Sequence, residues 1–192
     1  VKILGAEGWA LRCSADVVGA FECSDPVVNA ADRIIYWSMQ SNFQHVLMDC
    51  PHREKQGWLE VAHLMAPSIL FRLGAANFYR KIQNDMADMQ APNDGMIPTI
   101  APFAPGDPRA GMPLAEDGYR NSPAWSSAFV INPGMVWQWT GDRTLIEKYY
   151  DSMKLYVAYL TTRSKDGILS YGHGDWMPRE RTPVAISTTA IF

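Results

Sequence analysis

The chain has 192 residues, of which 47% are hydrophobic and 19% are charged. This is typical of a globular protein with one well-buried core and excludes a disordered chain. The net charge is −3 and there is no long basic run, which argues against nucleic acid and anionic membrane surfaces as partners. No apolar stretch of the sequence is long enough to span a bilayer.

The first 24 residues contain two short segments that are compatible with β-strands, residues 9–13 and 17–21. Two strands of this length cannot bury a sheet by themselves. We therefore expect residues 1–24 to be either the remnant of a preceding β domain or a strand pair that lies on a helical body.

Three helices are predicted to begin with a capping residue followed by proline, at Asp25-Pro26, Ser122-Pro123 and Thr182-Pro183. A side-chain oxygen at the cap accepts a free backbone N–H, and proline fits the first turn, where its missing donor costs nothing. Further helices are predicted over residues 58–73, with a kink at Pro67, and over residues 75–90 and 142–163.

The helix at 142–163 has the clearest pattern. Thr144 and Glu147 have the spacing of a capping box. An apolar stripe follows and is predicted to be core, formed by Leu145, Tyr149, Met153, Tyr156, Val157 and Leu160.

Helix pairs alternate with a long loop at residues 97–118 and an irregular segment at residues 171–176. A loop as long as the first is usually either functional or disordered. Helix pairs with loops gathered at one end are typical of an (α/α)6 toroid. We predict a mainly α fold, with residues 25–192 forming the N-terminal half of such a barrel. A complete toroid has about twice as many helices as the roughly six predicted here. The chain also stops in an apolar helix without a cap signal, so we expect a fragment.

One short segment, residues 49–60, concentrates charge and carries Asp49, Arg53, Glu54 and Glu60. Arg53 can clamp a carboxylate or sugar hydroxyls. The charge of Asp49 and partial burial would raise the pKa of Glu54, as a general acid requires. On spacing alone, a solvated charge cluster that caps the helix near Trp58 is the alternative.

The run from Asp49 to Trp58 resembles the signature of glycoside hydrolase family 78, the α-L-rhamnosidases. That signature reads Asp-Cys-Pro-x-Arg, followed by Glu-Arg-Leu-Gly-Trp. The resemblance implies that Glu54 is the general acid. It also implies that Asp49 and Arg53 bind rhamnose hydroxyls and that Trp58 lines the sugar site.

Family members often continue with Thr-Gly-Asp, whereas this chain continues with Leu59-Glu60-Val61. The aspartate is missing from its register, and Glu60 is the candidate that replaces it one residue earlier. The role of Glu60 and the substrate therefore remain open.

Weaker resemblance extends to two later segments. Residues 123–128 are similar to the family's Gly-Trp-Gly-Asp-Ala segment, with Ser127 in place of aspartate, which makes Trp125 a candidate sugar platform. An indole face suits the apolar face and methyl group of a 6-deoxy sugar, although Trp125 is equally suited to a core. Gly174-Asp175-Trp176 resembles a run on a loop at the barrel mouth, which adds Asp175 and Trp176 as candidates.

The resemblance implies an inverting glycoside hydrolase that removes terminal α-L-rhamnose. Glu54 would protonate the glycosidic oxygen, and a second carboxylate about 6.5–9.5 Å away would activate water. No residue here matches the family's base, so we expect it in the remainder of a parent chain and expect this chain alone to be inactive. The alternatives are another toroid glycosidase, such as an α-L-fucosidase, or a non-catalytic carbohydrate-binding module.

The sequence implies no cofactor and no metal. The four histidines lack metal-ligand spacing, and a calcium ion among Asp94, Glu116 and Asp117 has no specific support. A disulfide between Cys13 and Cys23 stays open, and we expect most of the seven tryptophans to lie in the core. The compartment is not determined, although a carbohydrate substrate favours the periplasm or the exterior.

Overall fold

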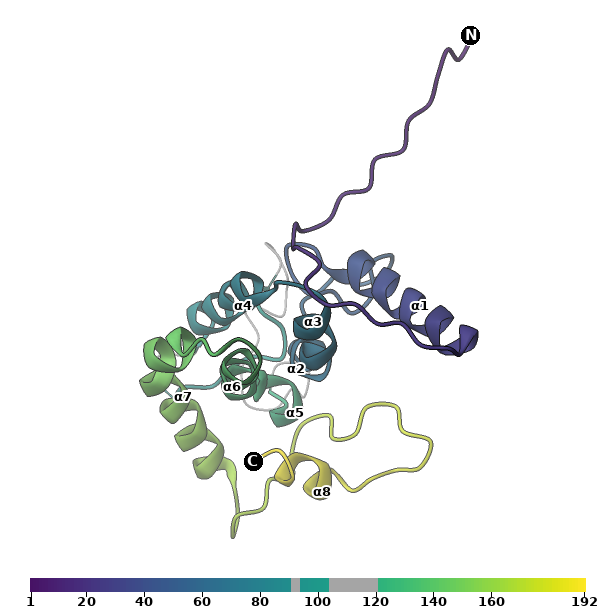
Figure 1. Ribbon diagram of the computed structural model, residues 1–192. Coiled ribbons are helices and arrows are strands. Elements are labelled where there is room, and N and C mark those ends of the chain that lie inside the picture. The colour runs from purple at the N-terminus through teal and green to yellow at the C-terminus, as the bar shows by residue number, and fades with distance from the viewer. Residues whose placement is uncertain (91–93, 104–120) are drawn as a thin grey trace.

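A computed structural model describes residues 1–90, 94–103 and 121–192, and its regular elements are helices (Figure 1). In the described part of the chain, none of the helices is long and apolar enough to cross a membrane. Much of the proline-rich loop, with Glu116 and Asp117, lies outside the described residues. The helices are α1 (Pro26–Asn42), α2 (Leu59–Leu64), α3 (Ala66–Arg72), α4 (Ala76–Asp88), α5 (Pro123–Ser126), α6 (Ala128–Thr140), α7 (Thr144–Arg163) and α8 (Val184–Thr189).

The N-terminal segment does not form the two expected strands. Residues 9–13 and 17–21 contain one isolated antiparallel bridge, between Val17 and Leu73. The segment pairs with helix ends instead, because the Cys13 N–H donates to the Phe43 carbonyl at 3.0 Å and the Val18 N–H donates to the Arg72 carbonyl at 3.0 Å. The first residues of the chain extend away from the helical body (Figure 1).

Helix α1 begins as predicted, because Asp25 Oδ1 accepts the N–H groups of Val27 and Val28 at 2.8 and 3.4 Å. The predicted capping box at α7 is wrong. There the acceptor is Asp142 Oδ1, which receives the Thr144 N–H at 2.9 Å. An aspartate two residues before the helix can accept the same free donor as a capping side chain.

The helix predicted at 58–73 is two helices rather than one kinked helix. Helix α2 ends at Leu64, and α3 resumes with Pro67 in its first turn. The cause is that proline has no N–H to donate to the carbonyl four residues earlier, and its ring crowds that carbonyl. The break lets α2 and α3 each present a separate face to α6, against which both pack.

Helix α6 is the centre of the core and packs against α2, α3, α4 and α7. The predicted stripe on α7 is confirmed, except that Val157 is exposed. The five other stripe residues are buried and join the main hydrophobic cluster. The core therefore forms between α6 and the helices around it, as expected from the 3.6-residue period.

Helix α6 contains Pro133, which removes one backbone donor from the helix interior. The carbonyl that loses its partner is that of Phe129, four residues earlier. Gln83 on α4 supplies the missing donor, because its Nε2 donates to the Phe129 carbonyl at 2.8 Å. Both Gln83 and Phe129 are fully buried, so this bond satisfies a group that water does not reach.

We expect Gln83→Met, which keeps the side-chain length but removes the donor, to lower the free energy of unfolding by about 1–3 kcal/mol. Pro133→Ala restores an N–H that can donate to the same Phe129 carbonyl. The loss in the Gln83→Met, Pro133→Ala double variant should therefore be smaller than the sum of the single losses, as measured by urea unfolding. Simple additivity would show that the two groups do not serve the same carbonyl.

Candidate functional site

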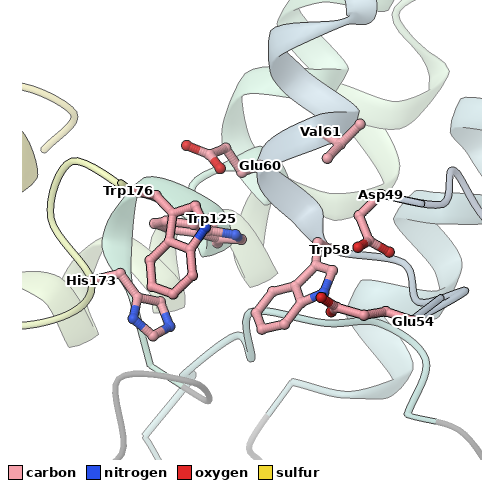
Figure 2. Close-up of a pocket in the computed structure, with 8 residues that line it drawn as sticks. All are labelled: Asp49, Glu54, Trp58, Glu60, Val61, Trp125, His173 and Trp176. Carbon is pink, nitrogen blue, oxygen red and sulfur yellow. The ribbon is translucent and has the colours of Figure 1, made fainter. Parts of the chain in front are cut away.

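Eight side chains line a pocket with a volume of about 260 Å³, close to the lower end of the roughly 300–1,000 Å³ usual for small-molecule sites (Figure 2). They come from three separate segments of the chain: residues 49–61, helix α5 and the loop that includes residues 173–176. The lining residues are Asp49, Glu54, Trp58, Glu60, Val61, Trp125, His173 and Trp176.

Six of these are residues that the sequence predicts for the site, and two predicted residues are not in the lining. Arg53 is exposed and does not line the pocket. Asp175 is also exposed, and its Oδ2 accepts a hydrogen bond from the Thr182 hydroxyl at 3.0 Å. Thr182 therefore holds the loop beside the pocket instead of capping α8, whose cap position is Pro183.

Glu54 lies on the turn that precedes α2 and is exposed, in contrast to the expected partial burial. The reason is that residues 51–54 form a turn, and all four of them are exposed. Its carboxylate nevertheless stays at the pocket, because Glu54 Oε2 accepts the indole N–H of Trp58 at 2.8 Å (Figure 2). The indole thus fixes the direction of an otherwise mobile side chain.

Glu60 is a carboxylate of the pocket whose pKa is raised by its surroundings. It lies half-buried in the first turn of α2. Burial raises the pKa of Glu60, and the negative charge of Asp175 raises this pKa further. The pocket therefore holds one carboxyl group that retains its proton to a higher pH than an ordinary glutamate.

Val61, which follows Glu60, also lines the pocket and lies beside Asp49 in Figure 2. Glu60 lies nearer to Trp125 and Trp176 in the same view. Neighbouring positions of α2 thus contribute a carboxylate to one part of the pocket and methyl groups to another. Val61 was not predicted as a site residue, because an apolar residue in a helix is usually core.

The raised pKa of Glu60 should be visible in the pH dependence of the free energy of unfolding. The folded-state pKa of Glu60 lies above its ordinary value of 4.5, so the folded protein binds more protons than the unfolded chain, and stability falls as pH rises through the folded pKa. We expect Glu60→Gln to match the wild type below about pH 4.5 and to be more stable near pH 7. Thermal unfolding across pH measures this difference.

Asp175→Asn is the matched control for that measurement, because it removes the second cause of the shift and leaves burial in place. In the Asp175→Asn background, the stabilisation by Glu60→Gln near pH 7 should be smaller. A difference between Glu60→Gln and wild type that does not change with pH would contradict the expectation.

Aromatic rings form the remaining wall of the pocket. Trp125 contacts His173 with ring centroids 5.0 Å apart and Trp176 at 6.3 Å, both edge-on. His173 also lies 5.1 Å from Trp176 and 6.5 Å from Trp58. The pocket therefore combines aromatic rings with carboxylates: Glu60 lies near Trp125 and Trp176, and Asp49 and Glu54 lie near Trp58, as Figure 2 shows.

His173 is the second lining residue that was not predicted from the sequence. Its backbone N–H donates to the Ser122 hydroxyl oxygen at 3.1 Å, so Ser122 holds this loop and is not a side-chain cap for α5. Gly172 makes the close approach possible, because its φ is +96° and a Cβ there would lie 2.8 Å from the Ser122 hydroxyl. The flanking glycines were the signal that a tightly held loop lies here.

The tryptophans are mostly outside the core, contrary to expectation. All seven lie in the described residues; Trp125 is 3% exposed, Trp58 is half-buried, and the five others are between 43% and 82% exposed. Trp125 is buried in the core, as the alternative to a sugar platform predicted, and it also lines the pocket.

Other candidates for metal or thiol chemistry have structural explanations. His63 is buried and donates from Nε2 to the Ala124 carbonyl at 2.7 Å, and burial lowers its pKa. The three cysteines are free thiols. In the described part of the chain, Asp49, Cys50 and Glu54 hold ligand atoms within 4.8 Å of one another, and a hydrogen bond from the Cys50 thiol to Asp49 Oδ2 accounts for part of that closeness.

The helical fold and a pocket built from carboxylates and tryptophans define the class of protein as a six-hairpin glycosidase. The six-hairpin fold class predicted from the sequence is thereby confirmed. The profile of the bacterial α-L-rhamnosidase six-hairpin glycosidase domain matches residues 16–191, and the chain belongs to this family.

Individual relatives agree with this assignment. The chain is 31% identical over 187 residues to an α-L-rhamnosidase of Formosa agariphila, covering 91% of this chain and 19% of that protein. It is 30% identical over 189 residues to an α-L-rhamnosidase of Streptomyces avermitilis, covering 96% of this chain and 17% of that protein. The chain thus spans less than a fifth of the length of these curated relatives.

Solved structures show the same similarity in three dimensions. The structure of the Streptomyces avermitilis α-L-rhamnosidase complexed with L-rhamnose matches with a TM-score of 0.82 and 27% identity, over 94% of this chain and 17% of that one. The α-L-rhamnosidase from Dictyoglumus thermophilum matches with a TM-score of 0.80 and 28% identity, over 94% of this chain and 20% of that one.

Proposed function

We propose that this chain contributes the acid-bearing part of the active site of an inverting α-L-rhamnosidase. The observation that carries the proposal is the convergence of Asp49, Glu54 and Trp58 with Trp125 and Trp176 on one pocket. These residues come from three segments that are far apart in the sequence, and each was selected by its likeness to rhamnosidase sequences. Membership of the family and the relative that binds L-rhamnose support the same substrate.

In this proposal, Glu54 protonates the glycosidic oxygen as the bond to the leaving alcohol breaks. The indole N–H of Trp58 directs its carboxylate. Asp49 accepts hydrogen bonds from sugar hydroxyls, and Trp125 and Trp176 contact the apolar face of the ring. Arg53 and Asp175 remain candidates for contacts with a bound sugar, because both lie next to residues of the lining in the sequence.

The raised pKa of Glu60 favours a second candidate for the proton donor. A general acid must hold its proton near working pH, and burial together with the charge of Asp175 gives Glu60 that property. Glu54 remains our assignment because it lies at the open turn beside Asp49, where a leaving group has room. Removal of each carboxylate in turn separates the two assignments.

The inverting route needs a base that activates water on the opposite face of the sugar. We infer that the base lies outside these 192 residues, in the remainder of a longer parent chain. The expected result is that the chain alone binds L-rhamnose, as detected by tryptophan fluorescence, but does not release 4-nitrophenol from an aryl α-L-rhamnoside. Turnover by the 192-residue chain at an ordinary enzyme rate of about 1–10³ s⁻¹ would contradict this inference.

The complete product of the gene that encodes this sequence tests the function itself. We expect it to hydrolyse an aryl α-L-rhamnoside in preference to the matching aryl α-L-fucoside, with β-rhamnose as the first product by NMR. Preference for the fucoside would favour a different toroid glycosidase. Binding of rhamnose without turnover would favour a carbohydrate-binding module.

A further inference from the structure

The turn that carries Asp49 and Glu54 is closed around the side chain of Cys50. The Cys50 thiol donates to Asp49 Oδ2 at 2.8 Å, and its sulfur accepts the backbone N–H of Glu54 at 3.2 Å. The Cys50 carbonyl accepts the N–H of Lys55 at 3.2 Å. One side chain therefore contacts two of the three residues whose carboxylates line the pocket.

The hydrogen bonds continue from Cys50 to the groups that face the pocket. The other oxygen of Asp49, Oδ1, accepts the Gln56 N–H at 3.3 Å, so both oxygens of this carboxylate have a donor. Glu54 is held at its backbone by the Cys50 sulfur and at its carboxylate by the Trp58 indole, at 2.8 Å. A carboxylate fixed in this way does not need to be ordered when substrate binds.

Cys50 also lies where a side chain that can neither donate nor accept a hydrogen bond would remove two contacts of the turn. The residue is half-buried, and Lys55, which closes the turn, has a φ of +57°, in the left-handed region. A non-glycine residue in that region is held there by its surroundings, and the thiol contacts are part of them. Removal of the thiol would leave Asp49 Oδ2 and the Glu54 N–H to find new partners.

We propose that Cys50 is a positioning residue. It sets the orientation of the Asp49 carboxylate and the position of Glu54, so that both carboxylates can contact the same bound sugar. The catalytic consequence rests on the proposed function, whereas the hydrogen-bond network does not. Because a misplacement of about 1 Å can cost roughly 10²-fold in rate, loss of the thiol should be visible in the kinetics.

Cys50→Ala and Cys50→Ser in the complete gene product test the kinetic consequence. Alanine should lower kcat/KM for an aryl α-L-rhamnoside by about 10–100-fold, with kcat falling further when the leaving group is a poor one. Serine, which can donate and accept the same two bonds, should recover most of the activity. Cys13→Ala is the matched control, because Cys13 is also half-buried but its backbone pairs with Phe43. A Cys50→Ala enzyme with wild-type kinetics would overturn the proposal, as would Cys50→Ser as impaired as Cys50→Ala.

A second readout does not depend on activity. In the 192-residue chain, the indole N–H resonance of Trp58, assigned with Trp58→Phe, should shift in Cys50→Ala and stay in place in Cys50→Ser and Cys13→Ala. If this holds while the complete protein hydrolyses no rhamnoside, the proposed function fails and the positioning of the turn by Cys50 stands. An unchanged Trp58 resonance in Cys50→Ala would overturn the positioning role itself.

Discussion

Glu54→Gln in the complete gene product should lower kcat for an alkyl α-L-rhamnoside by about 10²–10⁴-fold, the usual contribution of general acid catalysis. The physical reason is that an alkoxide is a poor leaving group and needs the proton that Glu54 would donate. A 4-nitrophenyl rhamnoside needs much less protonation, so its kcat should fall far less. Binding of L-rhamnose, measured by tryptophan fluorescence, should change little, because glutamine keeps an acceptor for the Trp58 indole.

Glu60→Gln is the matched control for this experiment, because Glu60 lines the same pocket and carries the raised pKa. If Glu54 is the acid, Glu60→Gln should affect alkyl and 4-nitrophenyl rhamnosides to the same extent. A loss in Glu60→Gln that depends on the leaving group, with none in Glu54→Gln, would transfer the acid role to Glu60. That result would also mean that the half-buried carboxyl, rather than the one at the open turn, supplies the proton.

Trp125→Ala should lower the free energy of unfolding of the 192-residue chain by about 3–5 kcal/mol, the range for removing a large buried aromatic side chain. Trp125 is 3% exposed and belongs to the main hydrophobic cluster, so its removal leaves a cavity that neighbouring helices cannot fill. The same change should weaken L-rhamnose binding at least tenfold, about 1.4 kcal/mol, because the aromatic wall of the pocket is lost. Urea unfolding and fluorescence titration measure the two effects.

Trp176→Ala separates the two roles of the aromatic wall. Trp176 lines the same pocket but is 51% exposed, so its removal should change stability by no more than about 0.5 kcal/mol while still weakening sugar binding. If both variants lost stability equally, the loop that carries Trp176 would be part of the core. If neither lost binding, the wall would not be a sugar platform.

The structural features that depend on residues a few positions apart were predicted well from the sequence. The cap at Asp25 and the stripe on α7 depend on neighbouring backbone donors and on helical period, and both appear in the structure, apart from Val157. Ser122 and Thr182 have the same local pattern as Asp25, yet their hydroxyls bond to the loop that carries His173 and Asp175. A hydroxyl near a helix start will bond to whichever partner the fold brings closest, which lies 51 residues away for Ser122 and seven residues away for Thr182.

The candidate site shows the same division. Six of its eight lining residues could be selected because they lie in runs that resemble rhamnosidase sequences, whereas Val61 had no such signal and only the flanking glycines marked the loop of His173. The exposure of Glu54 and the raised pKa of Glu60 were not predictable. Burial and charge depend on how α2 and the loop at residues 173–176 pack together, and two carboxylates six residues apart in the sequence can have different surroundings.

By itself, the sequence determined that this protein is helical and which short segment concentrates the acidic and aromatic chemistry, but it did not show the break between α2 and α3. Only the tertiary structure decided that residues 49–61, Trp125 and the loop with Trp176 share one pocket, and that Cys50 ties two of its carboxylates together. The physical reason is the distance along the chain over which each kind of interaction acts. Caps and helical period act over a single turn of the chain, whereas desolvation, ring contacts and hydrogen bonds between distant segments exist only after the core around α6 has formed.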